Sequence, residues 1–299
     1  MKIKRVKLCV VFLIMITACQ DAQNDKLRID EDYLVQFEKR KNSKPAGPRL
    51  FYLQLIGMFE LSPLTTNEFG SDTSNIHKIK YDGVPAVIGT IELTDDSMVF
   101  RSTGDSEVVN SEGSVISEYT FIIENNGNSK RLMSGNFQWY VTRFGGKYYL
   151  RLLDTTNPSI KNFKGFEYYQ PTNEFIIEGK VKLFDKPVKS TVPTVLGIEE
   201  TTDFVGTVSF NYGGSEYKLL MEKGGFIMFA DETSGDTTYG AGRYLKIRKP
   251  NDDESTLIDF NYAFNPPCSF SDYTTCLFPP KENRLPFKVE AGEKAEKRG

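Results

Sequence analysis

The feature that most constrains the fold is the spacing of apolar residues from position 50 onward. They alternate with polar residues or form short runs, and glycine, proline and asparagine separate the runs. Side chains two residues apart share one face of a strand, so this spacing predicts strands and not helices. The expected strands are residues 50–55, 86–93, 98–101, 115–123, 137–142, 148–153, 174–183, 205–210, 216–220, 226–229, 243–247 and 257–261.

The connections between these runs favour an antiparallel arrangement. Asn126-Gly127, Gly145-Gly146 and Gly213-Gly214 lie between apolar runs, as hairpin turns do. One helix is expected at residues 26–42, where apolar side chains recur at three- and four-residue spacing, and we expect it to cap the sheet. The chain is therefore predicted to be mainly β: an antiparallel β-sandwich or open barrel with one N-terminal helix.

The first 18 residues have the layout of a signal peptide. Four positive charges in residues 1–7 precede an apolar run at residues 8–16, and Ala18 closes the segment. This run is much shorter than the roughly 20 residues that a membrane-spanning helix needs. The segment is therefore predicted to direct export and not to span the membrane.

Residues 16–19 (Ile-Thr-Ala-Cys) resemble a bacterial lipobox, which predicts that Cys19 is lipidated after cleavage. Acyl chains on one cysteine anchor a protein stably without a transmembrane helix. Residues 19–25 would form a flexible tether, and we expect the domain to lie on the periplasmic or outer-surface side of the bacterial cell envelope. The alternative is an ordinary secretory cleavage with Cys19 incidental.

Charge limits the partners of the mature chain. Removing residues 1–18 removes four positive charges and no negative one, so the formal charge moves from −3 to −7. A net negative surface does not favour polyanions, which argues against nucleic acid as a partner. Motifs for nucleotide loops, zinc proteases and serine hydrolases are absent from the sequence, so no cofactor is expected and an enzymatic role stays open.

A string of spaced residues near the C-terminus resembles a known family. It consists of Asp231, Thr233, Thr238-Tyr239-Gly240, Gly242-Arg243-Tyr244, Asp259-Phe260-Asn261, Asn265-Pro266-Pro267-Cys268, Cys276, Glu282-Asn283-Arg284-Leu285 and Ala291-Gly292-Glu293-Lys294. The string resembles the signature of a bacterial family catalogued as domain of unknown function 1684. A looser similarity extends upstream to about residue 50, through Arg143, Arg151 and Asp154 among others. The resemblance implies a family but no function.

The domain organisation follows from this resemblance. Residues 186–203 contain Pro187 and Pro193 and show little pattern, which makes them the best place for an internal boundary. Because the resemblance crosses them, we interpret them as a long connection within a single domain, residues 26–299.

Cys268 and Cys276 remain as an even pair once the other two cysteines are assigned to the signal peptide and the lipid. In an exported protein this predicts a structural disulfide. The alternatives are a metal site, a redox-active pair and two free thiols. The metal site is disfavoured because the single histidine, His77, is far away in the sequence, and no metal is expected.

Residues 231–240 follow one expected strand and precede another. Their serine, threonine and aspartate side chains predict a hairpin in which hydroxyls and carboxylates satisfy turn amides. A calcium loop is the alternative, but Gly242 stands where a bidentate glutamate would be needed.

Polar residues of the C-terminal signature are the candidate binding site. Arg243 offers a planar fork for a carboxylate or phosphate. The candidates are Asp231, Thr233, Tyr239, Arg243, Asp259, Asn261, Asn265, Asn283 and Arg284, with Arg143, Arg151 and Asp154 as a second tier. For each set the alternative is structural, as loop ties or surface ion pairs.

Two functions follow from these candidates. The preferred one is a binding protein for a small molecule, a glycan or a protein partner. The alternative is an envelope hydrolase that uses Asp231 or Asp259 as the carboxylate and Arg243 as an anion clamp. A purely structural role in the envelope is the third possibility.

Overall fold

The structure is a computed structural model that describes residues 29–43, 47–94, 97–103 and 107–295. The predicted signal peptide, Cys19 and the tether lie outside these residues. Among the helices described, none is both long and apolar enough to cross a lipid bilayer.

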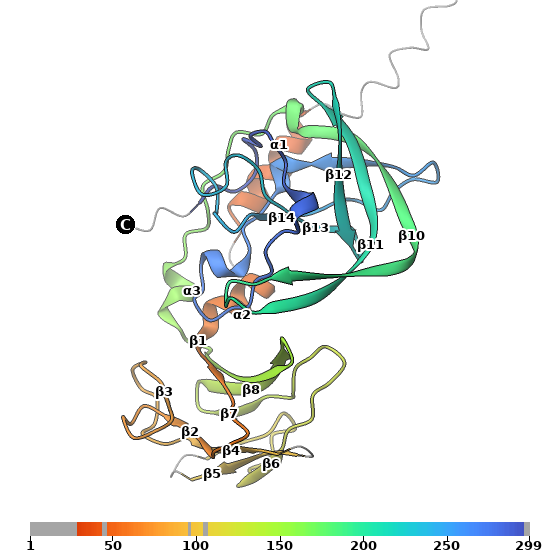
Figure 1. The fold of residues 1–299 in the computed structure, drawn as a ribbon. Helices are drawn as coiled ribbons and strands as arrows, with labels where there is room; N and C mark the ends of the chain where they lie inside the picture. Colours follow the sequence, from red (N-terminus) through yellow and green to blue (C-terminus); the bar gives the residue numbers. More distant parts are fainter. Residues whose placement is uncertain (1–28, 44–46, 95–96, 104–106, 296–299) are drawn as a thin grey trace, which may run out of the picture.

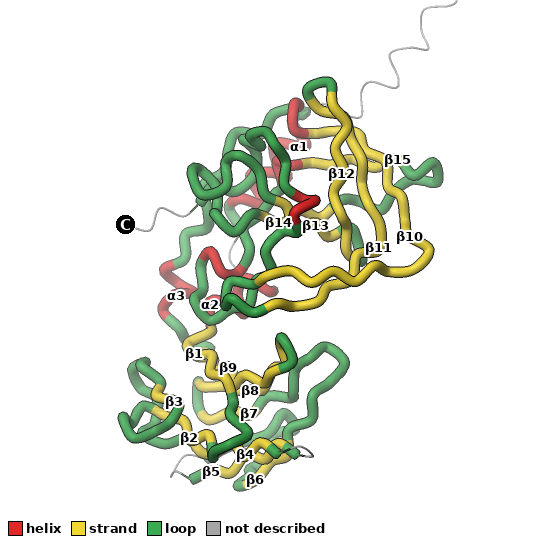
Figure 2. The backbone as a smooth tube through the Cα atoms, viewed as in Figure 1, coloured by secondary structure: helices red, strands yellow, loops and turns green. Residues whose placement is uncertain are grey.

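The chain is mainly β, as predicted, and its described strands form three sheets (Figures 1 and 2). Two of the sheets face each other in an N-terminal sandwich. One contains, in spatial order, β1 (Leu55–Glu60), β9 (Lys147–Asp154), β8 (Phe137–Phe144) and β7 (Leu132–Ser134). The other contains β3 (His77–Lys78), β2 (Asn67–Gly70), β4 (Gly89–Leu93), β5 (Met98–Ser102) and β6 (Glu118–Thr120).

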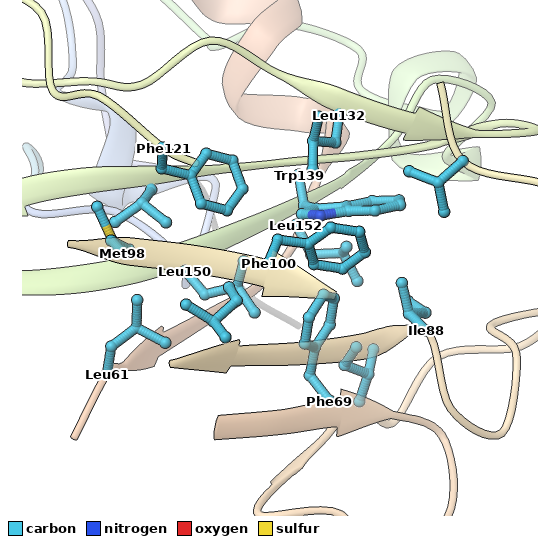
Figure 3. Close-up of a cluster of buried hydrophobic side chains, with 14 of the residues drawn as sticks. Leu61, Phe69, Ile88, Met98, Phe100, Phe121, Leu132, Trp139, Leu150 and Leu152 are labelled. Atoms are coloured by element: carbon cyan, nitrogen blue, oxygen red, sulfur yellow. The ribbon is translucent and has the colours of Figure 1, made fainter. Parts of the chain in front are cut away.

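The core of the sandwich lies between these two sheets. Trp139, Phe69 and Phe100 are fully buried and their rings contact one another (Figure 3). Leu150 and Leu152 join them from the neighbouring strand. Strand alternation therefore commits the odd-numbered positions of β8 and the even-numbered positions of β9 to this core, which leaves the other face of their sheet for a second contact.

The third sheet is a half-barrel with its own core. Its order is β14 (Arg243–Lys246), β13 (Phe226–Phe229), β12 (Ser215–Glu222), β11 (Glu199–Tyr212), β10 (Ile176–Pro193) and β15 (Ser255–Asp259). The C-terminal segment carries the short turns η4 (Phe260–Tyr262), η5 (Pro267–Ser269) and η6 (Lys281–Asn283). This segment packs Leu285, Val289 and Ala291 into the half-barrel core, so it completes the core rather than trailing from it.

In the described part of the chain, three α-helices flank the sheets. They are α1 (Glu31–Lys41), α2 (Pro48–Gln54) and α3 (Pro158–Asn162), and η3 (Asn173–Phe175) leads into β10. In α1, Asp30 caps the first turn by accepting a hydrogen bond from the Tyr33 amide, and basic residues occupy the last turn. Although α1 precedes the sandwich in sequence, its Tyr33 and Phe37 rings pack on Tyr262 of the half-barrel side.

Two expectations about local structure are wrong. Most of residues 50–55, expected as a strand, belong to α2, because Pro48 supplies a helical φ at the first position and costs no hydrogen bond there. Residues 186–203 are mostly continuous strand and not a connection. Pro187 is tolerated because it lies in the irregular stretch between Leu183 and Val188, where pairing with β11 is interrupted, and β15 pairs with β10 only as far as Lys180. Pro193 is the last residue of β10.

A backbone contact between sheet and loop gives the first test. A methyl group on Gly70 would overlap the Ala86 carbonyl oxygen, whereas one on Gly240 would find its nearest neighbour at 3.6 Å. Gly70→Ala is expected to lower the free energy of unfolding by about 1–3 kcal/mol, as overpacking does. Gly240→Ala, the control, should change it by less than about 0.5 kcal/mol. Equal urea midpoints for the two variants would contradict this packing.

Candidate functional site

Arg243 and Asp231 form a buried ion pair at the centre of the C-terminal signature. Arg243 begins β14 and is 0% exposed, and its Nη2 donates to Asp231 Oδ2 over 2.8 Å. The same Nη2 donates to the Val289 carbonyl at 2.9 Å, and Nη1 donates to the Ala291 carbonyl. The guanidinium thus holds the C-terminal segment against the sheet.

The other oxygen of Asp231 organises the 231–240 hairpin. Its Oδ1 accepts hydrogen bonds from the Thr233 amide, the Thr233 hydroxyl and the Val289 amide. The Thr233 hydroxyl also lies 2.8 Å from that of Thr238. These contacts describe a hydrogen-bonded hairpin, which is the structure that the sequence favoured over a calcium loop.

Three asparagines of the signature act as ties between chain segments. Asn283 accepts from the Leu220 amide and donates to the carbonyls of Leu220 and Met228. Asn261 bonds both backbone groups of Thr172. The Asn265 side chain donates to the Lys294 carbonyl. Each side chain satisfies backbone groups that a buried irregular segment would otherwise leave unpaired.

Asp259 lies in a different contact from Asp231. Both of its oxygens accept from the Tyr33 hydroxyl of α1, at 3.1 and 3.0 Å, and Oδ1 also accepts from the Asn261 amide. Burial raises the pKa of Asp259, although these hydrogen bonds oppose the rise. The carboxylate therefore fastens α1 to the half-barrel.

These contacts therefore do not bring the candidate residues together into one binding site around Arg243. Arg243 is enclosed and bonded to protein groups, so it does not fit the role of an anion clamp for an external ligand. Asp231 and Asp259 are likewise engaged in separate structural contacts. Of the remaining candidates, Arg284 and Arg143 are exposed, Tyr239 donates to the Cys268 carbonyl, and Asp154 accepts from Tyr81 and Thr156.

Arg151 differs from Arg243 in having no carboxylate partner among the described residues, although the Nε of each arginine lacks a hydrogen-bond partner. Arg151 is 7% exposed and lies on the face of β9 opposite the sandwich core, directly across from Tyr140 of β8. Its Nη2 donates to the Thr275 hydroxyl at 3.0 Å, and its Nε has no hydrogen-bond partner. Within the described residues Arg151 forms no ion pair with a carboxylate, whereas Arg243 does.

Arg151 interacts with Thr275, Tyr140 and Tyr52, and Tyr52 in turn lies near Tyr244 and Cys276. We call Arg151, Tyr52, Tyr140, Tyr244, Thr275 and Cys276 the Arg151 cluster. Burial raises the pKa of Tyr52 and of Tyr140, and the positive charge of Arg151 opposes both rises. Arg131 lies over the Tyr140 ring at 5.6 Å and adds a second positive charge.

The two cysteines lie side by side as free thiols, so the predicted disulfide is absent from this structure. The Cys268 amide donates to Cys276 Sγ at 3.1 Å. No group of three or more His, Cys, Asp or Glu side chains arranged for a metal ion is found in the part of the chain that the structure describes.

Residues 161–294 match the model of a family described as "Protein of unknown function (DUF1684)". This segment belongs to that family. A solved structure of an uncharacterized protein of Haloarcula marismortui is 27% identical and has a TM-score of 0.39, over 46% of this chain and 80% of that one. A search of curated proteins finds no match.

The family segment covers the half-barrel and the Arg243–Asp231 ion pair. Arg151 and the rest of the looser upstream similarity lie before residue 161, outside this segment. Asp231, Arg243, Asn265 and Asn283, four of the residues by which the sequence resembles DUF1684, hold the C-terminal segment in place. The family signature therefore describes a fold constraint at these positions.

Two members of the Arg151 cluster, Thr275 and Tyr52, belong to no sequence motif. Tyr244 belongs to the C-terminal signature, but nothing in the sequence connects it to Arg151. The Tyr140–Arg151 pair had a usable signal, because a two-residue turn at Gly145-Gly146 fixes the register that places them opposite each other.

The buried ion pair gives a stability test. Arg243→Met leaves the Asp231 carboxylate buried without its cation, and we expect a loss of about 3–5 kcal/mol in the free energy of unfolding. Arg284→Met removes an exposed arginine of the same signature and should change it by less than about 0.5 kcal/mol. Urea unfolding measures both variants, and a neutral Arg243→Met would show that the pair does not support the fold.

Asp259 gives a pH test with a definite sign. Because its folded pKa is raised, its contribution to stability is present below the unfolded pKa of about 3.9 and is lost as pH rises through the folded value. The wild type should therefore lose stability relative to Asp259→Asn between about pH 4 and pH 7. Hydrogen bonds from Ser255 lower the pKa of Asp253, so its contribution to stability has the opposite pH dependence. As pH rises, the wild type should gain stability relative to Asp253→Asn. Urea unfolding at each pH measures both comparisons.

Proposed function

We propose that this protein binds a small anionic molecule, with Arg151 holding its carboxylate, phosphate or sulfate group. The observation that carries the proposal is the buried guanidinium of Arg151, which has no carboxylate partner among the described residues and an unpaired Nε. A buried charge without a counter-ion is costly, because desolvation opposes it and nothing compensates. A bound anion would supply the missing charge.

The chemistry around Arg151 supports an anion over other ligands. A guanidinium presents paired N–H donors in the geometry that carboxylate and phosphate accept. The Tyr52 and Tyr140 hydroxyls are protonated at neutral pH, because the ordinary tyrosine pKa is about 10 and burial raises it further. Tyr52 and Thr275 are half-buried, so solvent reaches part of the cluster. The tyrosine and threonine hydroxyls can donate hydrogen bonds to a bound anion, and the positive charges of Arg151 and Arg131 attract it.

The cellular setting of this function rests on the sequence. A signal peptide and a lipidated Cys19 would hold the domain at the membrane of the bacterial envelope, with the Arg151 cluster available to a soluble anion. The preferred function inferred from the sequence, ligand binding, is kept here with its site moved from Arg243 to Arg151. The hydrolase alternative is not favoured, because Asp231 and Arg243 are bonded to each other and to the fold.

The test compares two arginines on neighbouring strands. Phosphate, sulfate and acetate are titrated into the wild type, Arg151→Gln and Arg143→Gln by isothermal calorimetry. At least one anion should bind the wild type, and Arg151→Gln should weaken it by about tenfold or more, since a hydrogen bond to a charged group contributes about 1.5–3 kcal/mol. Arg143 is exposed, so Arg143→Gln is the matched control.

Stability in anion-free buffer provides a second measurement. Replacing an uncompensated buried charge by an apolar side chain is expected to leave the free energy of unfolding unchanged or to raise it, so Arg151→Met should behave oppositely to Arg243→Met. No binding of any of the three anions by the wild type, or equal binding by Arg151→Gln, would overturn the proposal.

A further inference from the structure

Hydrogen-bond donors converge on the sulfur of Cys276. The Cys268 amide donates to Cys276 Sγ at 3.1 Å, and the Thr274 hydroxyl lies 3.7 Å from the same atom. Interactions with the Cys268 thiol and the Tyr244 hydroxyl also lower the pKa of Cys276. A neutral thiol is a weak acceptor and does not need this many donors, whereas a thiolate does.

The two sulfurs are therefore chemically unequal. The hydrogen bond from the Cys268 thiol, together with the amide and hydroxyl donors, lowers the pKa of Cys276. The same interaction and burial raise the pKa of Cys268, which keeps its proton. One thiolate beside one protonated thiol is the arrangement of an attacking and a resolving cysteine.

The backbone holds the loop between the two cysteines in place. The Val195 amide donates to the Cys276 carbonyl, and Thr194 and Leu277 form an isolated bridge, so the tip of the β10–β11 hairpin supports this loop. Because the Cys268 amide lies 3.1 Å from Cys276 Sγ, the Cys276 sulfur is next to Cys268. Bond formation between them requires no large movement of the chain.

We propose that Cys276 and Cys268 form a dithiol–disulfide couple that reduces a small hydroperoxide, with Cys276 as the attacking thiolate. The Cys276 sulfur attacks one peroxide oxygen, the O–O bond breaks, and the leaving hydroxide takes a proton from solvent to become water. Cys276 is then a sulfenic acid. The Cys268 sulfur next attacks the Cys276 sulfur, the S–O bond breaks, and the departing hydroxide leaves as water with the Cys268 proton. Two thiols and one hydrogen peroxide give one disulfide and two waters.

Burial selects the size of the oxidant. Cys268 is 8% exposed and Cys276 is 4% exposed. A protein disulfide could not reach either sulfur without opening the loop, whereas hydrogen peroxide is about as small as two waters. The couple needs no anion at Arg151, so it goes beyond the proposed function and can succeed or fail independently of it.

The experiment uses the full chain with Cys9→Ser and Cys19→Ser, so that Cys268 and Cys276 are the only cysteines. The chain is reduced, treated with one equivalent of hydrogen peroxide, and analysed by peptide mass spectrometry. The expected product is an internal 268–276 disulfide that has lost two hydrogens. In Cys268→Ser, dimedone should trap a sulfenic acid on Cys276, and in Cys276→Ser peroxide consumption should be lost.

Several results would overturn the proposal. They are two intact thiols in the parent chain after treatment, oxidation of Cys276→Ser as fast as that of the parent, or a first modification on Cys268. Circular dichroism checks that the serine variants fold. If either does not, the parent chain decides the question by which cysteine dimedone labels first when peroxide and dimedone are added together.

Discussion

The fold of the C-terminal half depends on one buried charge pair. Arg243 and Asp231 neutralise each other, and each has spare hydrogen-bonding capacity that reaches the backbone of residues 289–291. Segments far apart in sequence, the hairpin after β13, the start of β14 and the chain end, are thereby held at one point. The end of the chain then completes the half-barrel core with Val289 and Ala291. Without this pair an irregular segment would have to be buried with unpaired carbonyls.

Arg151 shows how the same residue type serves another purpose when its surroundings change. Arg243 has a carboxylate and carbonyl acceptors, so its charge is compensated within the protein. Arg151 has a threonine hydroxyl, tyrosine hydroxyls and a second arginine near its neighbour Tyr140. The compensated charge of Arg243 supports the fold, whereas the uncompensated charge of Arg151 is suited to binding an anion. Cys276 directly follows Thr275, the hydrogen-bond partner of Arg151, so the two unequal thiols lie close to this arginine.

Local sequence patterns predicted much of the secondary structure. The run at residues 226–229 matches β13, and the glycine pairs at 145–146 and 213–214 turn between adjacent antiparallel strands with positive φ. Such features follow from neighbours along the chain. The errors have tertiary causes: Pro187 argues against a strand, yet it lies where the pairing of β10 with β11 is interrupted. The apolar run in α2 is too short to show whether its period is that of a helix or of a strand.

The mainly β class, the family match of residues 161–294 and the list of polar candidates all follow from the amino-acid sequence. The role of each candidate follows from its contacts in the folded chain. Asp231, Asp259 and Asn283 look equivalent along the chain, yet they hold three different contacts, and Arg151 stands out only because no carboxylate faces it. The reason is physical: a charged group is structural or available according to what compensates it, and its compensating partners come from distant parts of the chain.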